Sequence, residues 1–118
     1  MSTEEEDGLD LLQGTLDLMI LQTLRMGRAH GHAIARLIEV WSDDVLQVGH
    51  GSLYPALQRL LKLGFVSAED GVSENNRKAR FYRLTAKGRR QLLAETSRWM
   101  RFSAAVHRIL AAPVEENS

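Results

Sequence analysis

The chain has 118 residues, of which 44% are hydrophobic and 25% are charged. This length predicts one small domain and excludes a multidomain enzyme, and the composition is typical of a globular protein. The sequence has no cysteine, which excludes disulfides, thiolate metal sites and a cysteine nucleophile, and no apolar run approaches the roughly 18 residues that a membrane helix needs.

The formal net charge is zero, but the charges are unevenly distributed. Residues 1–10 hold five carboxylates and no lysine or arginine, whereas residues 71–90 hold seven lysines and arginines against one glutamate. A basic segment of this kind either lies on a solvated face or binds a polyanion. The acidic start lacks the basic and apolar segments of a signal peptide, so we expect a cytoplasmic protein with an N-terminal tail over residues 1–10.

Two amphipathic helices are predicted in the first half of the chain. Apolar side chains at three- and four-residue spacing predict the first over residues 11–26, ended by Gly27. Four apolar residues between positions 34 and 41 share one face of the second helix, which ends near Ser42 and places Trp41 in the core.

Two histidines precede the second helix and raise the question of a metal site. His30 and His32 flank Gly31, and no carboxylate or third histidine stands nearby at ligand spacing. We therefore interpret them as part of a polar turn and predict neither a metal nor a cofactor.

A third helix is predicted in the segment HGSLYPALQRLLKLG, residues 50–64, although it contains a proline. Ser52 is a suitable N-cap, which would place Pro55 in the first turn, where a missing backbone donor costs little. Gly64 ends the helix. The core-facing stripe consists of Leu53, Leu57, Leu60 and Leu61.

The opposite face of this helix carries polar, cationic and aromatic side chains and no acid. Such a face is either a solvated surface or a helix that enters a DNA major groove. In the second case, Gln58 and Arg59 are the side chains that we expect to contact base edges. The residues of this helix that we predict to contact DNA are His50, Ser52, Tyr54, Pro55, Gln58, Arg59 and Lys62.

Two short strands, over residues 65–70 and 79–85, follow as a hairpin rich in aromatic and β-branched residues. A hairpin after three helices predicts a winged helix-turn-helix over residues 11–84, in a mainly α (α+β) fold. The hairpin tip would place Arg77, Lys78 and Arg80 beside the third helix, where they would contact DNA phosphates.

The last helix is predicted from the N-cap Thr85 to about residue 111, followed by Pro113 and a tail over residues 112–118. About 26 residues at a rise of roughly 1.5 Å span about 39 Å, so part of the helix projects from the domain. Its apolar seam either packs on the first helix or pairs with a second copy, or does both at different ends. The predicted dimerisation residues are Leu92, Thr96, Trp99, Met100, Ser103, Val106 and Leu110.

The segments GSLYPALQRLLKLGFV and RKARFYRLTAKGRRQL closely resemble the PadR family of bacterial transcriptional regulators. The hallmarks of that family are a Tyr-Pro-Ala-Leu recognition helix and a Tyr-Arg-Leu-Thr wing strand that leads to a glycine. The resemblance covers residues 11–110, and the length is similar to that of the short-tailed subgroup, in which one C-terminal helix makes the dimer. It implies a homodimeric repressor that binds double-stranded DNA at a palindromic operator.

The resemblance also implies a small aromatic effector, bound near a tryptophan between the C-terminal helices. Trp99 occupies a comparable position, although a tryptophan on an apolar seam also serves as interface core. This chain departs from the family where many members have His-Gly-Tyr-Glu, because it has His30, Gly31, His32 and Ala33.

Two functional classes other than DNA binding are an enzyme and a protein-binding module. No paired nucleophile and base, glycine-rich phosphate loop or metal spacing is present, so we do not expect an enzyme. A winged helix that binds another protein is the alternative, because a fold does not determine function. The basic character of both the third helix and the hairpin tip favours DNA.

Overall fold

The computed structural model describes residues 14–115 and confirms the predicted winged helix. The first helix covers residues 14–23 of this range, and the tail over residues 1–10, the start of the first helix and residues 116–118 lie outside it. The other elements, in chain order, are η1 (Leu24–Met26), β1 (Ala29–His30), α2 (Gly31–Trp41), α3 (His50–Lys62), β2 (Val66–Val72), β3 (Lys78–Leu84) and α4 (Ala86–Ala111).

The wing is the β2–β3 hairpin of an antiparallel sheet with the strand order β1-β3-β2. Val66 pairs with Leu84 at the base of the hairpin, and Val72 pairs with Lys78 next to its turn. The strands reach further toward the tip than the sequence predicted. The two-residue strand β1 was not predicted, and it ties the start of α2 to β3 through the pairs Ala29–Tyr82 and His30–Phe81.

The core lies between the first helix, α2, α3 and the sheet. It is completed by one residue of α4, and its buried apolar side chains are Ile20, Leu21, Leu24, Ile34, Ala35, Ile38, Leu53, Ala56, Leu57, Leu60, Val66, Tyr82, Leu84 and Leu92. The prediction that Trp41 is a core residue is wrong, because its side chain remains 49% exposed at the end of α2.

The start of α3 corrects the sequence prediction. Gly49 is the N-cap, because its carbonyl accepts hydrogen bonds from the backbone N–H groups of Ser52 and Leu53 at 3.1 and 3.0 Å. Pro55 therefore lies inside the helix rather than in its first turn. The N–H that proline lacks would have paired with the carbonyl of Gly51, which lies on the exposed side of the helix and is open to water.

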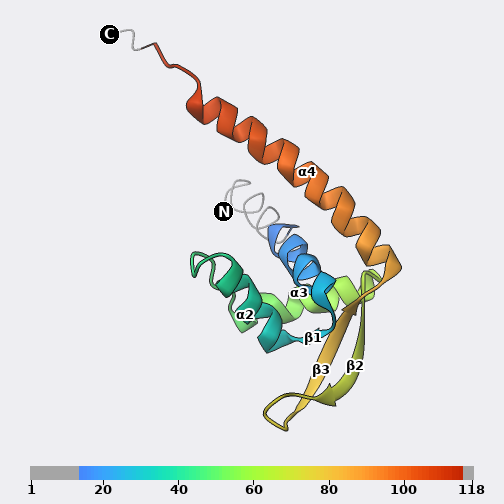
Figure 1. Ribbon diagram of the computed structural model, residues 1–118. Helices are drawn as coiled ribbons and strands as arrows, with labels where there is room; N and C mark the ends of the chain where they lie inside the picture. The colour runs from blue at the N-terminus through green and yellow to red at the C-terminus, as the bar shows by residue number, and fades with distance from the viewer. Residues whose placement is uncertain (1–13, 116–118) are drawn as a thin grey trace, which may run out of the picture.

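Helix α4 has the bounds that the sequence predicted. The Thr85 side chain accepts a hydrogen bond from the backbone N–H of Gly88 at 3.0 Å, and it donates one to the Gly64 carbonyl at 2.7 Å. These bonds fix the direction in which α4 leaves the hairpin. Figure 1 shows that α4 then projects away from the other helices, at the end of the molecule opposite the wing tip.

Candidate nucleic-acid interface

The outer face of α3 exposes the side chains that the sequence predicted. His50, Tyr54, Gln58 and Lys62 follow one another at intervals of four residues, and all four are exposed. The rings of His50 and Tyr54 stack with centroids 5.7 Å apart, and Tyr54 keeps 48% of its surface exposed. Ser52 and Pro55 lie on the same exposed side. This face therefore presents amide, hydroxyl, ammonium and aromatic groups together.

Arg59 has different surroundings from its neighbours on α3. Its guanidinium donates a hydrogen bond to the Asp17 carboxylate at 2.8 Å, across to the first helix. Burial raises the pKa of Asp17 above 3.8, although the Arg59 guanidinium opposes that shift. Arg59 was expected to contact base edges, but in this structure it holds α3 against the first helix. The contact joins residues far apart in the sequence, so no local pattern indicated it.

The wing carries three cationic side chains at its tip. Lys78 and Arg80 lie two residues apart on β3 and so share one face of the hairpin, while Arg77 precedes them in the turn. All three are exposed, and within residues 14–115 none of them forms an ion pair. The turn is closed by a hydrogen bond of 2.8 Å from the Ser73 N–H to the Arg77 carbonyl.

On the other face of the wing, one carboxylate pairs with two arginines. Glu69 pairs with Arg28 at 2.9 Å and with Arg83 at 3.4 Å, and hydrogen bonds from these two arginines lower the pKa of Glu69. Arg28 also lies over the ring of Phe81, 4.4 Å from its centroid. The two faces of β3 therefore differ: in the part of the chain that the structure describes, Lys78 and Arg80 form no ion pair, although Asp70 stands opposite Arg80 in the register.

His30 has a structural role that the sequence did not predict. Its Nδ1 accepts a hydrogen bond from the backbone N–H of Ala33 at 3.2 Å, so His30 is the N-cap of α2 rather than part of an irregular turn. His32 lies inside the first turn of that helix, with its ring 6.4 Å from the ring of His30. In the described part of the chain, no group of three possible ligands is placed to hold a metal ion.

The predicted dimerisation residues divide into two groups along α4. Leu92 is only 3% exposed within the core of its own chain, which leaves little of its side chain for contact with a partner. The large apolar side chains of α4 that remain exposed are Leu93, Trp99, Met100, Phe102, Val106, Ile109 and Leu110. Thr96 and Ser103 are partly buried beside them.

Comparison with known proteins identifies the family. Residues 20–94 match the family described as "Transcriptional regulator PadR-like family". The chain belongs to this PadR-like family. The resemblance read from the recognition helix and the wing strand is thereby confirmed, whereas the short-tailed subgroup stays a prediction.

Solved structures share the fold of this PadR-like chain. It is similar to a transcriptional regulator from Clostridium thermocellum with a TM-score of 0.75 and 25% identity, over 84% of this chain and 96% of that one. It is also similar to a PadR-like transcriptional regulator from Bacillus cereus with a TM-score of 0.74 and 25% identity, over 88% of this chain and 99% of that one. A relative from Lysinibacillus sphaericus, "Uncharacterized protein X", is 28% identical over 90 residues, which are 76% of this chain and 83% of the relative. The matched family and these two structures are all described as transcriptional regulators.

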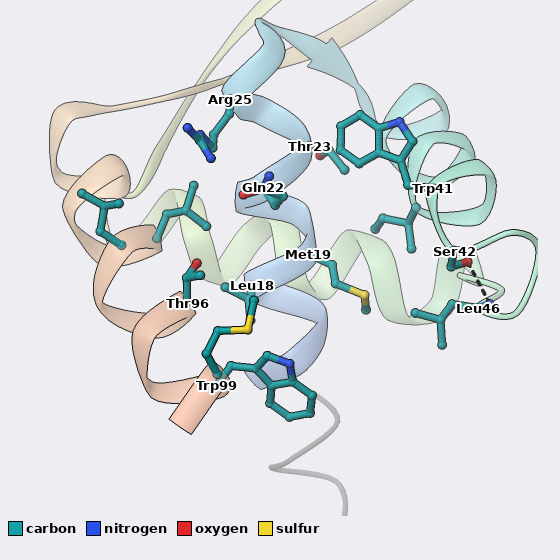
Figure 2. Close-up of a pocket in the computed structure, with 14 residues that line it drawn as sticks. Leu18, Met19, Gln22, Thr23, Arg25, Trp41, Ser42, Leu46, Thr96 and Trp99 are labelled. Carbon is teal, nitrogen blue, oxygen red and sulfur yellow. Dashed lines mark hydrogen bonds between the residues drawn. The ribbon is translucent and has the colours of Figure 1, made fainter. Parts of the chain in front are cut away.

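An apolar groove in this PadR-like chain joins α4 to the first helix and α2 (Figure 2). It has a volume of about 480 Å³, and its lining includes Trp41, Trp99, Met19 and Met100. Figure 2 shows the two tryptophans at opposite ends of the groove, one from α2 and one from α4.

In the described residues no helix is long and apolar enough to cross a bilayer.

Proposed function

We propose that this PadR-like regulator is a homodimer that binds a palindromic DNA operator, and that it acts in the cytoplasm. The observation that carries the proposal is the combination of an acid-free, exposed face on α3 with a wing tip whose cations form no ion pair with any carboxylate in residues 14–115. A helix of this kind fits the major groove of DNA, and a basic hairpin beside it fits the adjacent phosphate backbone.

The residues divide into two roles on DNA. Arg77, Lys78, Arg80 and Lys62 contact phosphates, which gives affinity without reading sequence. Gln58 stands at the centre of the exposed face of α3 and contacts base edges, because its amide is suited to pair with adenine. Arg59 acts indirectly, because its ion pair with Asp17 sets the position of α3.

The homodimer is supported by two apolar surfaces that match. The outer half of α4, over residues 99–111, carries exposed apolar side chains, among them Ile109 and Leu110, which are 72% and 77% exposed. The groove between the first helix, α2 and α4 is open and apolar, and its volume of about 480 Å³ is many times that of one water molecule. In a two-fold pair, the outer half of each α4 lies in the groove of the other copy, so that both surfaces are buried at once.

A small aromatic effector and a repressor role complete the proposal, and both follow from the family resemblance. The groove supports the effector, because Trp99 and Trp41 provide flat apolar contacts for an aromatic ring. Each of the variants Trp41→Phe and Trp99→Phe keeps one tryptophan of the groove, so we expect planar aromatic compounds to change the Trp fluorescence of both. No response from either variant over a broad panel would contradict the effector.

The test of the DNA-binding function uses fluorescence anisotropy with two duplexes. One is selected from a random pool over the purified full-length chain, and the other is a shuffled version of it. We expect tight binding to the selected duplex, weaker binding to the shuffled one and a steep loss of both with salt. Failure to bind either duplex at low salt would contradict the proposal and favour a protein-binding winged helix.

A further inference from the structure

A second concave surface lies between the wing and the start of α2. It has a volume of about 730 Å³, and its walls come from three places: the first turns of α2, Tyr54 of α3 and the tip of the hairpin. Its cationic lining residues are Arg36, Arg77, Lys78 and Arg80, and Glu74 is the carboxylate among them. We call this surface the wing cavity.

The cations of the wing cavity are available to a ligand. Those of the hairpin form no ion pair in the described part of the chain, and Arg36 makes only a long contact of 3.9 Å with Glu39. On the opposite face of the same sheet, Glu69 already pairs with Arg28 and Arg83. The cations of the hairpin on the cavity side therefore differ from Arg28 and Arg83, because within residues 14–115 they form no ion pair, although Asp70 stands opposite Arg80 in the strand register.

The N-cap of α2 adds a hydrogen-bond donor to this cavity. Because Nδ1 of His30 accepts a hydrogen bond from the Ala33 N–H, the ring nitrogen left to donate a hydrogen bond is Nε2. His30 thus offers an N–H group, next to the positive end of the α2 dipole. The Tyr54 hydroxyl lies nearby, 3.5 Å from where a Cβ on Gly31 would be.

We infer that the wing cavity holds the phosphates of one DNA strand, so that the start of α2 and the hairpin grip the backbone from two sides. This inference rests on the proposed DNA binding and extends it to His30, His32 and Arg36, which the sequence did not connect with DNA. Several cations and N–H donors that surround one concavity match a chain of phosphates rather than flat base edges. A DNA backbone bound in the wing cavity lies directly beside Tyr54 on α3. These contacts therefore also set the orientation in which α3 enters the adjacent major groove.

The test compares arginines inside the cavity with arginines outside it. Arg36→Gln and Arg80→Gln remove cations of the cavity, whereas the control variants Arg28→Gln and Arg83→Gln remove cations on the Glu69 side of the same sheet. Binding of each full-length variant to the shuffled duplex is measured by anisotropy over a range of salt concentrations. We expect each cavity variant to bind about tenfold more weakly and to lose about one unit of salt slope, with both controls close to wild type.

A second pair of variants tests His30. Both His30→Asp and His30→Asn keep a side chain that caps α2, so both are expected to fold, which circular dichroism checks. Only the aspartate places a negative charge at the phosphate site. We therefore expect His30→Asp to weaken binding at least tenfold more than His30→Asn does.

The possible outcomes separate this inference from the proposed function. Wild-type binding with equal effects from the cavity and control arginines, or equal effects from the two His30 variants, would overturn the inference and leave DNA binding intact. A wild-type chain that binds no duplex at low salt would overturn both.

Discussion

Gln58 and Arg59 are adjacent on α3, yet their side chains have different partners. Gln58 is exposed, whereas Arg59 is bound to Asp17 at 2.8 Å and both members of that pair are partly buried. We expect Gln58→Ala to narrow the affinity difference between the selected and shuffled duplexes and to leave the stability unchanged. Arg59→Ala should instead lower the free energy of unfolding by about 1 kcal/mol, because it leaves a partly buried carboxylate unpaired. Urea denaturation and anisotropy of both variants measure this contrast, and a loss of sequence preference only in Arg59→Ala would contradict the assigned roles.

The two carboxylates with shifted pKa values predict opposite pH effects on stability. The pKa of Asp17 is raised from 3.8, chiefly by burial, so the folded chain binds this proton more tightly than the unfolded chain does. The resulting stability is present at low pH and is lost as the pH rises through the pKa that Asp17 has in the folded chain. The pKa of Glu69 is lowered from 4.5 by its arginine hydrogen bonds, so its contribution is present above 4.5 and is lost as the pH falls. We expect the wild-type advantage over Asp17→Asn to shrink with rising pH and the advantage over Glu69→Gln to grow. Urea denaturation over a pH series tests both, and parallel curves for wild type and variants would contradict the assignment.

At the scale of elements, the direction of α4 depends on one close backbone contact. A Cβ on Gly88 would collide with the Phe65 carbonyl, so only glycine lets the first turn of α4 lie against the start of β2. We expect Gly88→Ala to destabilise the fold by about 3 kcal/mol. The matched control is Gly51→Ala on α3, where nothing lies within 4 Å of the added methyl and a gain of up to about 1 kcal/mol is expected. Thermal unfolding of both variants measures the difference, and similar melting temperatures would contradict this account of the junction.

Some elements of the fold can be predicted from the sequence and others cannot. The bounds of α4 were predicted correctly because Thr85 and Pro113 act on the backbone next to them. The start of α3 was predicted wrongly because both Gly49 and Ser52 suit an N-cap, and the pattern of side chains does not choose between them. Strand β1 was not predicted because a strand of two residues is too short to show a periodic pattern. The Asp17–Arg59 ion pair was not predicted because it joins distant segments and leaves no local signal in the sequence. The exposed face of α3 and the basic wing tip were predicted because each lies in one continuous segment.

At the scale of the whole molecule, the wing and the outer half of α4 lie at opposite ends (Figure 1). One end can therefore contact DNA while the other pairs with a second copy. The double variant Val106→Glu and Leu110→Glu places carboxylates on the exposed apolar stripe of α4, so we expect sedimentation to give the 13.3 kDa of a single chain. Its affinity for the selected duplex should fall about 100-fold or more, because the two half-sites are no longer bound by linked copies. Ala104→Glu, which adds a carboxylate elsewhere on the same helix, is expected to remain a dimer, and a dimer in the double variant would contradict this role of α4.

In the proposed complex, two linked copies present two α3 helices to one DNA site. Hydroxyl-radical footprinting of the full-length protein on the selected duplex tests this arrangement. We predict two protected patches on one face of the DNA, with centres about 34 Å apart or a whole multiple of that distance. A single protected patch, or uniform protection along the duplex, would contradict the claim.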